Sequence, residues 1–331
     1  MTFEQFQSEV TGRIKDFLPS EYANADIRIM ETHKLNQSYP ALIVRLEEEG
    51  AAPSIDLAHF YEMSENGYSM EAVLTAVSEQ AQQRADGFDL GIFSDYRQIK
   101  DKLFIRISDA DVNHAVLQNV PHRNISGIAV TCHVMVEIQD GNVGSAMVNN
   151  GMLKSLGVSF DELYHDAMEN SPRILPPSIQ SMEDMLGRMI GFGPGKEIPQ
   201  DLESQLDAID FENDPMVVLT NREGVNGAAA ILYPDVLHRI GERAETNFFV
   251  LPSSVHEVIL VADNGHMKLP ELSAMVKEIN STQVAPKDRL SDTVYHYDRK
   301  ERLLEKGSDY EVRISAKETK ARAHKEKDWE R

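Results

Sequence analysis

Residues 134–148, VMVEIQDGNVGSAMV, align without a gap with residues 217–231, VVLTNREGVNGAAAI. The small residues that coincide are Gly141 with Gly224, Gly144 with Gly227, and Ala146 with Ala229. Each stretch consists of two short apolar runs separated by a turn rich in glycine and asparagine, which is typical of a strand, a turn and a strand. A helical pattern follows each copy. The repeat predicts an α+β fold with two related strand-turn-strand-helix lobes.

Composition divides the rest of the chain. Two apolar runs split by an acidic turn at 40–57 predict a hairpin, and Ser69 is placed to cap a helix. Residues 187–215 are rich in glycine, proline and acidic residues, so we expect a linker or a long surface loop there. The expected portions are 1–102 (helix and hairpin), 103–186 (first lobe), 187–215 (linker or loop), 216–300 (second lobe) and 301–331 (charged tail).

The formal net charge of -21 over 331 residues repels nucleic-acid phosphates and anionic lipid surfaces, so we expect no nucleic-acid partner and no membrane partner. No window reaches the roughly 18 apolar residues of a membrane-spanning helix, and the first 20 residues lack a signal-peptide core. These features predict a cytoplasmic protein. An acidic decoy for a basic nucleic-acid-binding protein stays an alternative, and the sequence does not decide the oligomeric state.

The connection LPSSVHEV, residues 251–258, brings Ser254, His256 and Glu257 within four positions. A hydrolase would need the histidine within hydrogen-bond reach of the serine and a third group to orient the ring. On a strand, His256 and Glu257 would point to opposite faces. No GxSxG motif is present. The stretch therefore favours a hairpin turn, and a hydrolase built from Ser254, His256 and an acid distant in sequence stays the alternative.

Other polar residues stand in predicted loops or at the start of strands. In VPHRNI, Arg123 could hold an anion or form a structural ion pair. In NREGVNG, asparagine amides could close turns or contact a ligand. We expect a ligand or partner site in the groove between the two lobes. The residues expected at its rim are His122, Arg123, Asn221, Asn226, Ser254, His256 and Glu257.

Three further clusters lack the spacing or the side-chain direction that a catalytic, metal or phosphate site requires. The side chains of Cys132 and His133 diverge on a strand, and a single cysteine excludes an intrachain disulfide and a cysteine-rich zinc site. His165 and Glu169 stand four apart on a helix, where a surface pair is the usual outcome. The stretch GFGPGKE at 191–197 lacks the spacing of a phosphate-binding loop. No catalytic residue, metal or cofactor is predicted.

Five segments together resemble the bacterial family known as domain of unknown function 5688, over roughly residues 25–300. They are PHRNISGIAV, LGVSFDELYHDAMENSPRILPPSIQSME, VLTNREGVNGAAAILYPDVL, FFVLPSSVHEVILVAD and STQVAPKDRLSDTVYHYDR. A fainter similarity points to domain of unknown function 1444. The resemblance implies a cytoplasmic bacterial protein and supplies no activity or functional residue. We therefore expect a non-enzymatic protein-binding or regulatory module.

Overall fold

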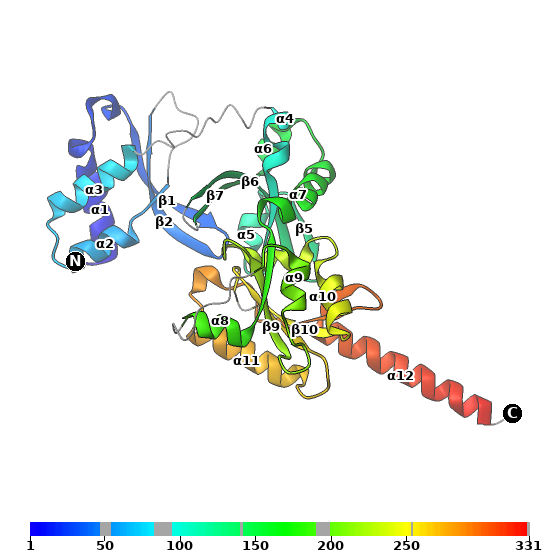
Figure 1. Cartoon of the computed structure of the whole chain (residues 1–331). Helices are drawn as coiled ribbons and strands as arrows, with labels where there is room; N and C mark the ends of the chain where they lie inside the picture. Colours follow the sequence, from blue (N-terminus) through cyan, green and yellow to red (C-terminus); the bar gives the residue numbers. More distant parts are fainter. Residues whose placement is uncertain (47–53, 83–94, 140–141, 190–198, 253, 330–331) are drawn as a thin grey trace. The chain divides into compact units, whose positions relative to one another are not determined.

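The computed structural model describes residues 1–46, 54–82, 95–139, 142–189, 199–252 and 254–329. The chain divides into two compact units, Met1–Asp89 and Leu90–Arg331. The segments expected as the first and second lobes lie in the same unit. Helices and several antiparallel sheets confirm the predicted α+β class (Figure 1).

The smaller unit contains a three-stranded antiparallel sheet in the order β1-β2-β3 and several helices. Its elements are α1 (Phe3–Arg13), η1 (Ile14–Phe17), η2 (Ser20–Tyr22), β1 (Asp26–Lys34), β2 (Gln37–Arg45), β3 (Ser54–Asp56), α2 (Ala58–Glu65) and α3 (Met70–Gln82). The antiparallel pair β2 and β3 confirms the hairpin predicted at 40–57. The Ser69 hydroxyl accepts a hydrogen bond from the Ala72 backbone N–H, so the predicted cap is confirmed.

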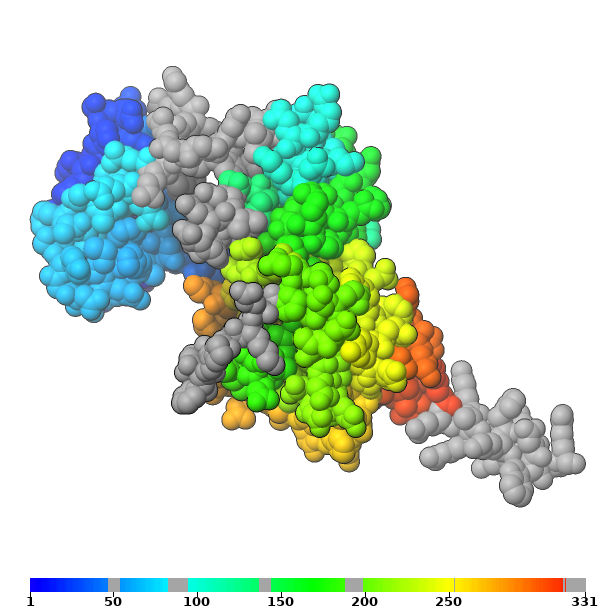
Figure 2. Space-filling view, in the orientation of Figure 1, coloured from blue at the N-terminus to red at the C-terminus, as the bar shows by residue number. Residues whose placement is uncertain are grey.

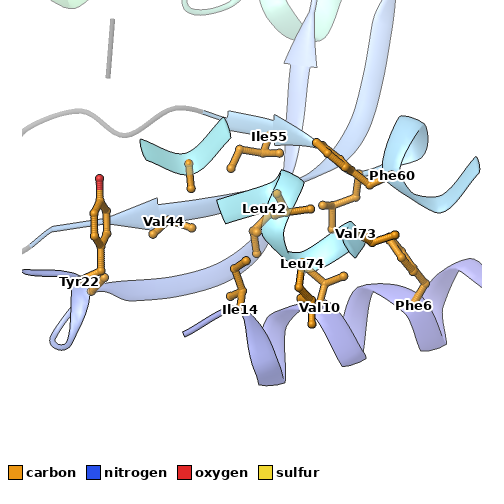
Figure 3. Packing of buried hydrophobic residues seen from close by; sticks show 14 residues of the cluster. Phe6, Val10, Ile14, Tyr22, Leu42, Val44, Ile55, Phe60, Val73 and Leu74 are labelled. Atoms are coloured by element: carbon orange, nitrogen blue, oxygen red, sulfur yellow. The ribbon is translucent and has the colours of Figure 1, made fainter. Parts of the chain in front are cut away.

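One apolar cluster holds the smaller unit together. Phe6, Val10 and Ile14 follow one another at intervals of four residues, so they share one face of the N-terminal helical segment. Figure 3 shows these side chains meeting residues of β2, β3 and α3 in a single core. Leu42 and Leu74 are fully buried in it. The unit therefore has a core of its own.

The larger unit begins with a four-stranded antiparallel sheet, in which β4, β5 and β7 all pair with β6. The elements of this part are α4 (Tyr96–Ile99), η4 (Lys100–Lys102), β4 (Leu103–Asp109), α5 (His114–Leu117), β5 (His122–Ile125), β6 (Ile128–Gln139), β7 (Asn142–Met147), α6 (Asn150–Leu156) and α7 (Phe160–Ile174). Helix α7 packs against β4, where the Ser171 hydroxyl accepts a hydrogen bond from the backbone N–H of Ile105. Ser159 and Glu162 form a capping box at the start of α7.

A second sheet, of six antiparallel strands, has the order β13-β12-β10-β11-β9-β8. The remaining elements are β8 (Pro177–Ser181), α8 (Met182–Met189), α9 (Leu202–Asp207), β9 (Met216–Asn221), η5 (Gly227–Leu232), α10 (Val236–Ala244), β10 (Phe248–Leu251), β11 (Val258–Ala262), α11 (Leu269–Thr282), η6 (Pro286–Asp288), β12 (Tyr295–Asp298), β13 (Leu303–Lys306) and α12 (Gly307–Trp329). Ion pairs Arg239–Glu203 and Arg243–Asp207 hold α10 beside α9, and the two helices adjoin on the surface in Figure 2.

A side chain of α9 bonds one backbone N–H at the outer edge of β8. Gln205 is buried, and its Oε1 accepts a hydrogen bond of 2.7 Å from the backbone N–H of Ile179. Its Nε2 donates to the carbonyl of Pro199 at 2.8 Å. Helix α9 lies inside the segment expected as a linker or loop at 187–215, of which residues 190–198 lie outside the described part.

The two aligned stretches of the repeat fold differently. The first forms the predicted hairpin, β6 and β7, although its Gly141 lies outside the described residues. In the second, the prediction of a strand at GAAAIL is wrong, because residues 227–232 form the 3₁₀ helix η5. Asn226 has a left-handed backbone with φ of 56°, which turns the chain out of the sheet after β9. The small side chains that follow are then fully buried.

The segment expected as a charged tail, 301–331, contains the edge strand β13 and the long helix α12. Arg313 of α12 donates hydrogen bonds to Glu305 of β13 and to Asp298 of β12. The first turns of α12 are thus bound to the sheet, while the side chain of Trp329 lies outside the described part. No helix among the described residues has both the length and the apolar character needed to cross a membrane.

Candidate functional site

The stretch quoted as LPSSVHEV joins two neighbouring strands. β10 and β11 pair antiparallel with Leu251 opposite Ile259, which confirms the predicted hairpin connection. The connection packs against the loop that follows β9: the backbone N–H of Ala228 donates to the carbonyl of Val255, and the Thr220 hydroxyl donates to the carbonyl of His256 at 2.7 Å. The structure thus brings together the two predicted segments NREGVN and SSVHE.

His256 has a hydrogen-bond partner on each ring nitrogen. Its Nδ1 accepts from the backbone N–H of Asn226 at 3.3 Å, and its Nε2 lies 3.3 Å from Oδ1 of Asp288. Because a backbone N–H only donates, Nδ1 carries no proton and Nε2 donates to the carboxylate. We call Asn226, Ser254, His256, Glu257 and Asp288 the His256 site. The side chains of His256 and Asp288 are each 31% exposed, so the pair faces solvent.

This arrangement differs from that of a nucleophile and its base. A general base needs a ring nitrogen with a free lone pair directed at the hydroxyl that it activates. The lone pair on Nδ1 of His256 is directed at the backbone of Asn226 instead. The Ser254 hydroxyl accepts a hydrogen bond from the backbone N–H of His256 at 3.0 Å, as in a serine turn. Ser254, His256 and a distant acid are therefore together, without the hydrogen bonds of a catalytic triad.

Gly227 allows the two loops of the site to approach each other closely. A side chain at this position would place its first carbon 2.2 Å from Oγ1 of Thr220, 2.5 Å from the backbone nitrogen of Asn221 and 2.6 Å from the carbonyl oxygen of His256. Such distances are too short for any carbon, so only glycine fits. The Asn221 side chain is buried and bonds both backbone groups of Val225, which closes the loop.

An open cavity of about 360 Å³ lies beside the His256 site, and we call it the acidic cavity. Its described lining residues are Gly224, Ser254, His256, Glu257, Gln283, Val284, Ala285 and Asp288. The prediction that His256 and Glu257 point to opposite faces is wrong, because both precede β11 and line this cavity. Among these described residues are two carboxylates and neither lysine nor arginine, so the cavity favours a cation.

Burial of Glu257 is the main influence on its acidity. It raises the pKa of the carboxyl group above the usual glutamate range, while the His256 ring and a hydrogen bond from Ser254 act in the opposite direction. The charge of Asp288 adds to the increase. A cation that entered the acidic cavity would stabilise the ionised form of Glu257 and lower its pKa again.

A second cavity, also of about 360 Å³, shares Gly224 of the loop after β9 with the first. We call it the polar cavity. Its described lining residues are Ser178, Gln180, Pro199, Gln200, Gln205, Thr220, Asn221, Arg222, Glu223 and Gly224. The amides of Asn221 and Gln205 are bonded within the protein. Among the described residues, Oε1 of Gln180 has no hydrogen-bond partner, so the lining retains a free acceptor.

His122 and Arg123 make their described contacts elsewhere in the larger unit. The ring of His122 bonds the carbonyl of Val120, and Arg123 donates to Asp161 at 2.7 Å. The Arg123 guanidinium also lies 4.1 Å from the ring centre of Tyr164. No described contact joins either residue to the His256 site. Arg123 thus forms the ion pair that was one of its two predicted roles.

The remaining sequence candidates have structural roles. Cys132 is fully buried, and burial raises the pKa of its thiol to about 12, so the reactive thiolate is scarce at neutral pH. His165 and Glu169 form an exposed pair at 3.4 Å on α7. Within the described ranges, no group of three or more His, Cys, Asp or Glu side chains could hold a metal ion. The stretch GFGPGKE lies wholly outside the described residues.

Asp288 is the site residue that sequence reasoning did not name. It follows Pro286 in the short helix η6, 32 positions after His256, and no motif connects the two. Its place is fixed by the backbone, because the carbonyl of Asp288 accepts a hydrogen bond from the N–H of Val255 at 2.8 Å. Only the pairing of distant segments identifies it.

Comparison with known proteins gives a family and no function. The chain matches the model of the Family of unknown function (DUF5688) over residues 3–299. This match confirms the resemblance drawn from the sequence and extends it to the whole of α1. No curated protein and no solved structure matches the chain.

Proposed function

Because the chain belongs to the Family of unknown function (DUF5688), whose description assigns no activity, we propose a function from the His256 site. The protein is a binding module whose acidic cavity receives a cationic side chain of a partner protein. The observation that carries this proposal is the cavity beside His256, whose lining combines Glu257 and Asp288. Both ring nitrogens of His256 are engaged, so the ring positions the loops and the carboxylates remain for recognition.

The charge of the cavity fits a lysine or arginine of the partner. A carboxylate pair attracts a cation more strongly where the surroundings are partly buried, because water screens the charges less there. The half-buried Glu257 and Asp288 meet this condition. The neighbouring polar cavity offers the free Oε1 of Gln180 to the backbone of the same partner segment. A basic segment lying across Gly224 would occupy both.

The test compares the tagged full-length protein with a variant of the site. Glu257→Gln with Asp288→Asn removes two charges but keeps the acceptor that His256 uses. Glu62→Gln with Glu65→Gln removes two exposed charges from α2 in the smaller unit and serves as the matched control. Each protein is used to capture partners from its native host at physiological salt, and the retained proteins are identified by mass spectrometry.

We expect one stoichiometric protein to be retained by the wild type and by the control, and lost with the site variant. Its binding should weaken as salt is added, because the interaction is electrostatic. It should also strengthen as the pH rises through the raised pKa of Glu257, since the cation binds the ionised carboxyl group. Equal retention by all three proteins, or retention of nothing by the wild type, would refute the proposal.

A further inference from the structure

One edge of the three-stranded sheet in the smaller unit is the strand β1 (Figure 1). All nine residues of β1 pair with β2 in a single register, from Asp26 opposite Arg45 to Lys34 opposite Gln37. In an antiparallel pair, successive residues direct their backbone N–H and C=O groups alternately toward the partner strand and away from it. Among the residues that the structure describes, no strand pairs with the outer side of β1.

This edge lacks several of the features that prevent an edge strand from pairing with another chain. Such features include short strands, prolines, bulges and groups that bond the outer backbone. β1 has nine residues, no proline and no bulge, whereas the edge strand β13 of the six-stranded sheet has only four residues. The side chain of Met30, in the middle of β1, is also 43% exposed. The length and regularity of β1 thus suit the addition of a further strand.

The charged side chains of β1 are complementary to those of a second copy in one register. Two copies that pair antiparallel about a twofold axis at Met30 place Asp26 of each opposite Lys34 of the other. The same register places Arg28 opposite Thr32. These side chains lie on one face of the sheet, because they stand at alternate positions of the strand. The twofold axis repeats each contact, so the interface contains two pairs of opposite charge.

The neighbouring registers that keep this face are less favourable. A shift of the pairing by two residues in one direction places Arg28 opposite Lys34, and Glu31 opposite Glu31 of the second copy. Like charges that stand directly opposite each other destabilise a pair of strands. The shift in the other direction places Asp26 opposite Thr32 and opposes no unlike charges within β1. The charges of the strand therefore select the register centred on Met30.

We propose that β1 pairs with β1 of a second copy of this chain and joins two three-stranded sheets into one continuous sheet. Oδ2 of Asp26 lies 3.4 Å from Arg28 and 3.3 Å from Arg45 of its own chain. A carboxylate has about four acceptor positions, so Lys34 of the second copy adds a donor to this exposed network. The surface lies in the smaller unit and shares no residue with the His256 site, so the two proposals fail separately.

Cysteine cross-linking of the full-length protein tests the pairing and its register together. The natural Cys132 is fully buried, so an introduced cysteine on β1 is the accessible thiol. Met30→Cys places two thiols opposite each other, where paired Cα atoms lie about 4.5–5.5 Å apart, as a disulfide requires. Thr32→Cys is the matched control on the same face, because its counterpart in the second copy lies four residues along, roughly 13 Å away. Mild oxidation should link Met30→Cys into a dimer and leave Thr32→Cys monomeric.

Exchange of the charges separates pairing of β1 from association through another surface. In sedimentation equilibrium, the wild type should change from monomer to dimer as its concentration rises. Lys34→Asp alone and Asp26→Lys alone each oppose like charges at two places, so each should weaken the dimer roughly tenfold or more. An equimolar mixture of the two variants restores both opposite-charge pairs and should dimerise again. Tyr68→Lys adds a charge at an exposed position of the same unit and should dimerise like the wild type.

Three results would overturn the proposal. The first is a wild type that stays monomeric up to its highest soluble concentration. The second is equal cross-linking of Met30→Cys and Thr32→Cys, which would show chance collision or a different register. The third is a dimer that Lys34→Asp leaves unchanged, because its surface would then lie elsewhere.

Discussion

Replacing Gly227 by alanine tests how the His256 site is built. The added carbon would lie 2.2 Å from a hydroxyl oxygen and 2.5 and 2.6 Å from two backbone atoms. The hydroxyl can rotate away, but the backbone atoms belong to β9 and to the connection before β11, which are held by the sheet. Overpacking of this kind costs about 1–3 kcal/mol, so we expect Gly227→Ala to destabilise the larger unit by that amount.

Hydrogen exchange followed by mass spectrometry reports each unit separately. Protection of peptides from β9 and β11 should fall roughly 5- to 150-fold, because each 1.4 kcal/mol corresponds to a factor of about ten. Peptides from α1 and α3 should not change, since they belong to the other unit.

Gly12→Ala is the matched control for this substitution. Nothing lies within 4 Å of the added carbon at Gly12 in α1, so the same change there should stabilise the smaller unit by about 0.5–1 kcal/mol. Unchanged protection of β9 and β11 in Gly227→Ala would refute the reasoning about the close approach.

Two other predictions concern buried hydrogen bonds. A bond from His296 lowers the pKa of Asp263 below its unfolded value, so the pair stabilises the fold above about pH 4 and the effect is lost as the pH falls through the folded pKa. The urea concentration at the unfolding midpoint should decrease less between pH 7 and pH 3 in Asp263→Asn than in the wild type. An equal decrease in both proteins would contradict this. Ser171→Ala should cost about 1–3 kcal/mol by urea unfolding, because the buried N–H of Ile105 loses its acceptor. Ser155→Ala on an exposed helix should cost under about 0.5 kcal/mol, and equal costs would count against the explanation.

Local patterns in the sequence predicted local structure well. The cap at Ser69, the box at Ser159 and Glu162, and the hairpin around LPSSVHEV are set by residues within a few positions of one another. Such signals act before the rest of the chain is in place, so a single sequence contains them. The segments NREGVN and SSVHE, which were expected at one rim, contact each other because β9 and β11 are neighbours in one sheet.

Features that depend on tertiary contact were not predictable in the same way. GAAAIL has the composition of a buried strand or a buried helix, and the choice depends on the left-handed turn at Asn226 and the packing of Gly227. Asp288 reaches His256 because η6 pairs with the connection before β11, which no spacing in the sequence indicates.

The side chain of Gln205 forms a hydrogen bond with the backbone at the β8 edge of the six-stranded sheet. Its Oε1 accepts from the backbone N–H of Ile179 where the next strand would lie, while its Nε2 donates to the carbonyl of Pro199, outside β8. Gln205 thus supplies one backbone-like acceptor to the edge, and the N–H of Ile179 is not open to another chain. Loss of that amide would leave the N–H of Ile179 free to pair with a strand of another molecule, so one uncharged side chain guards this point of the sheet edge.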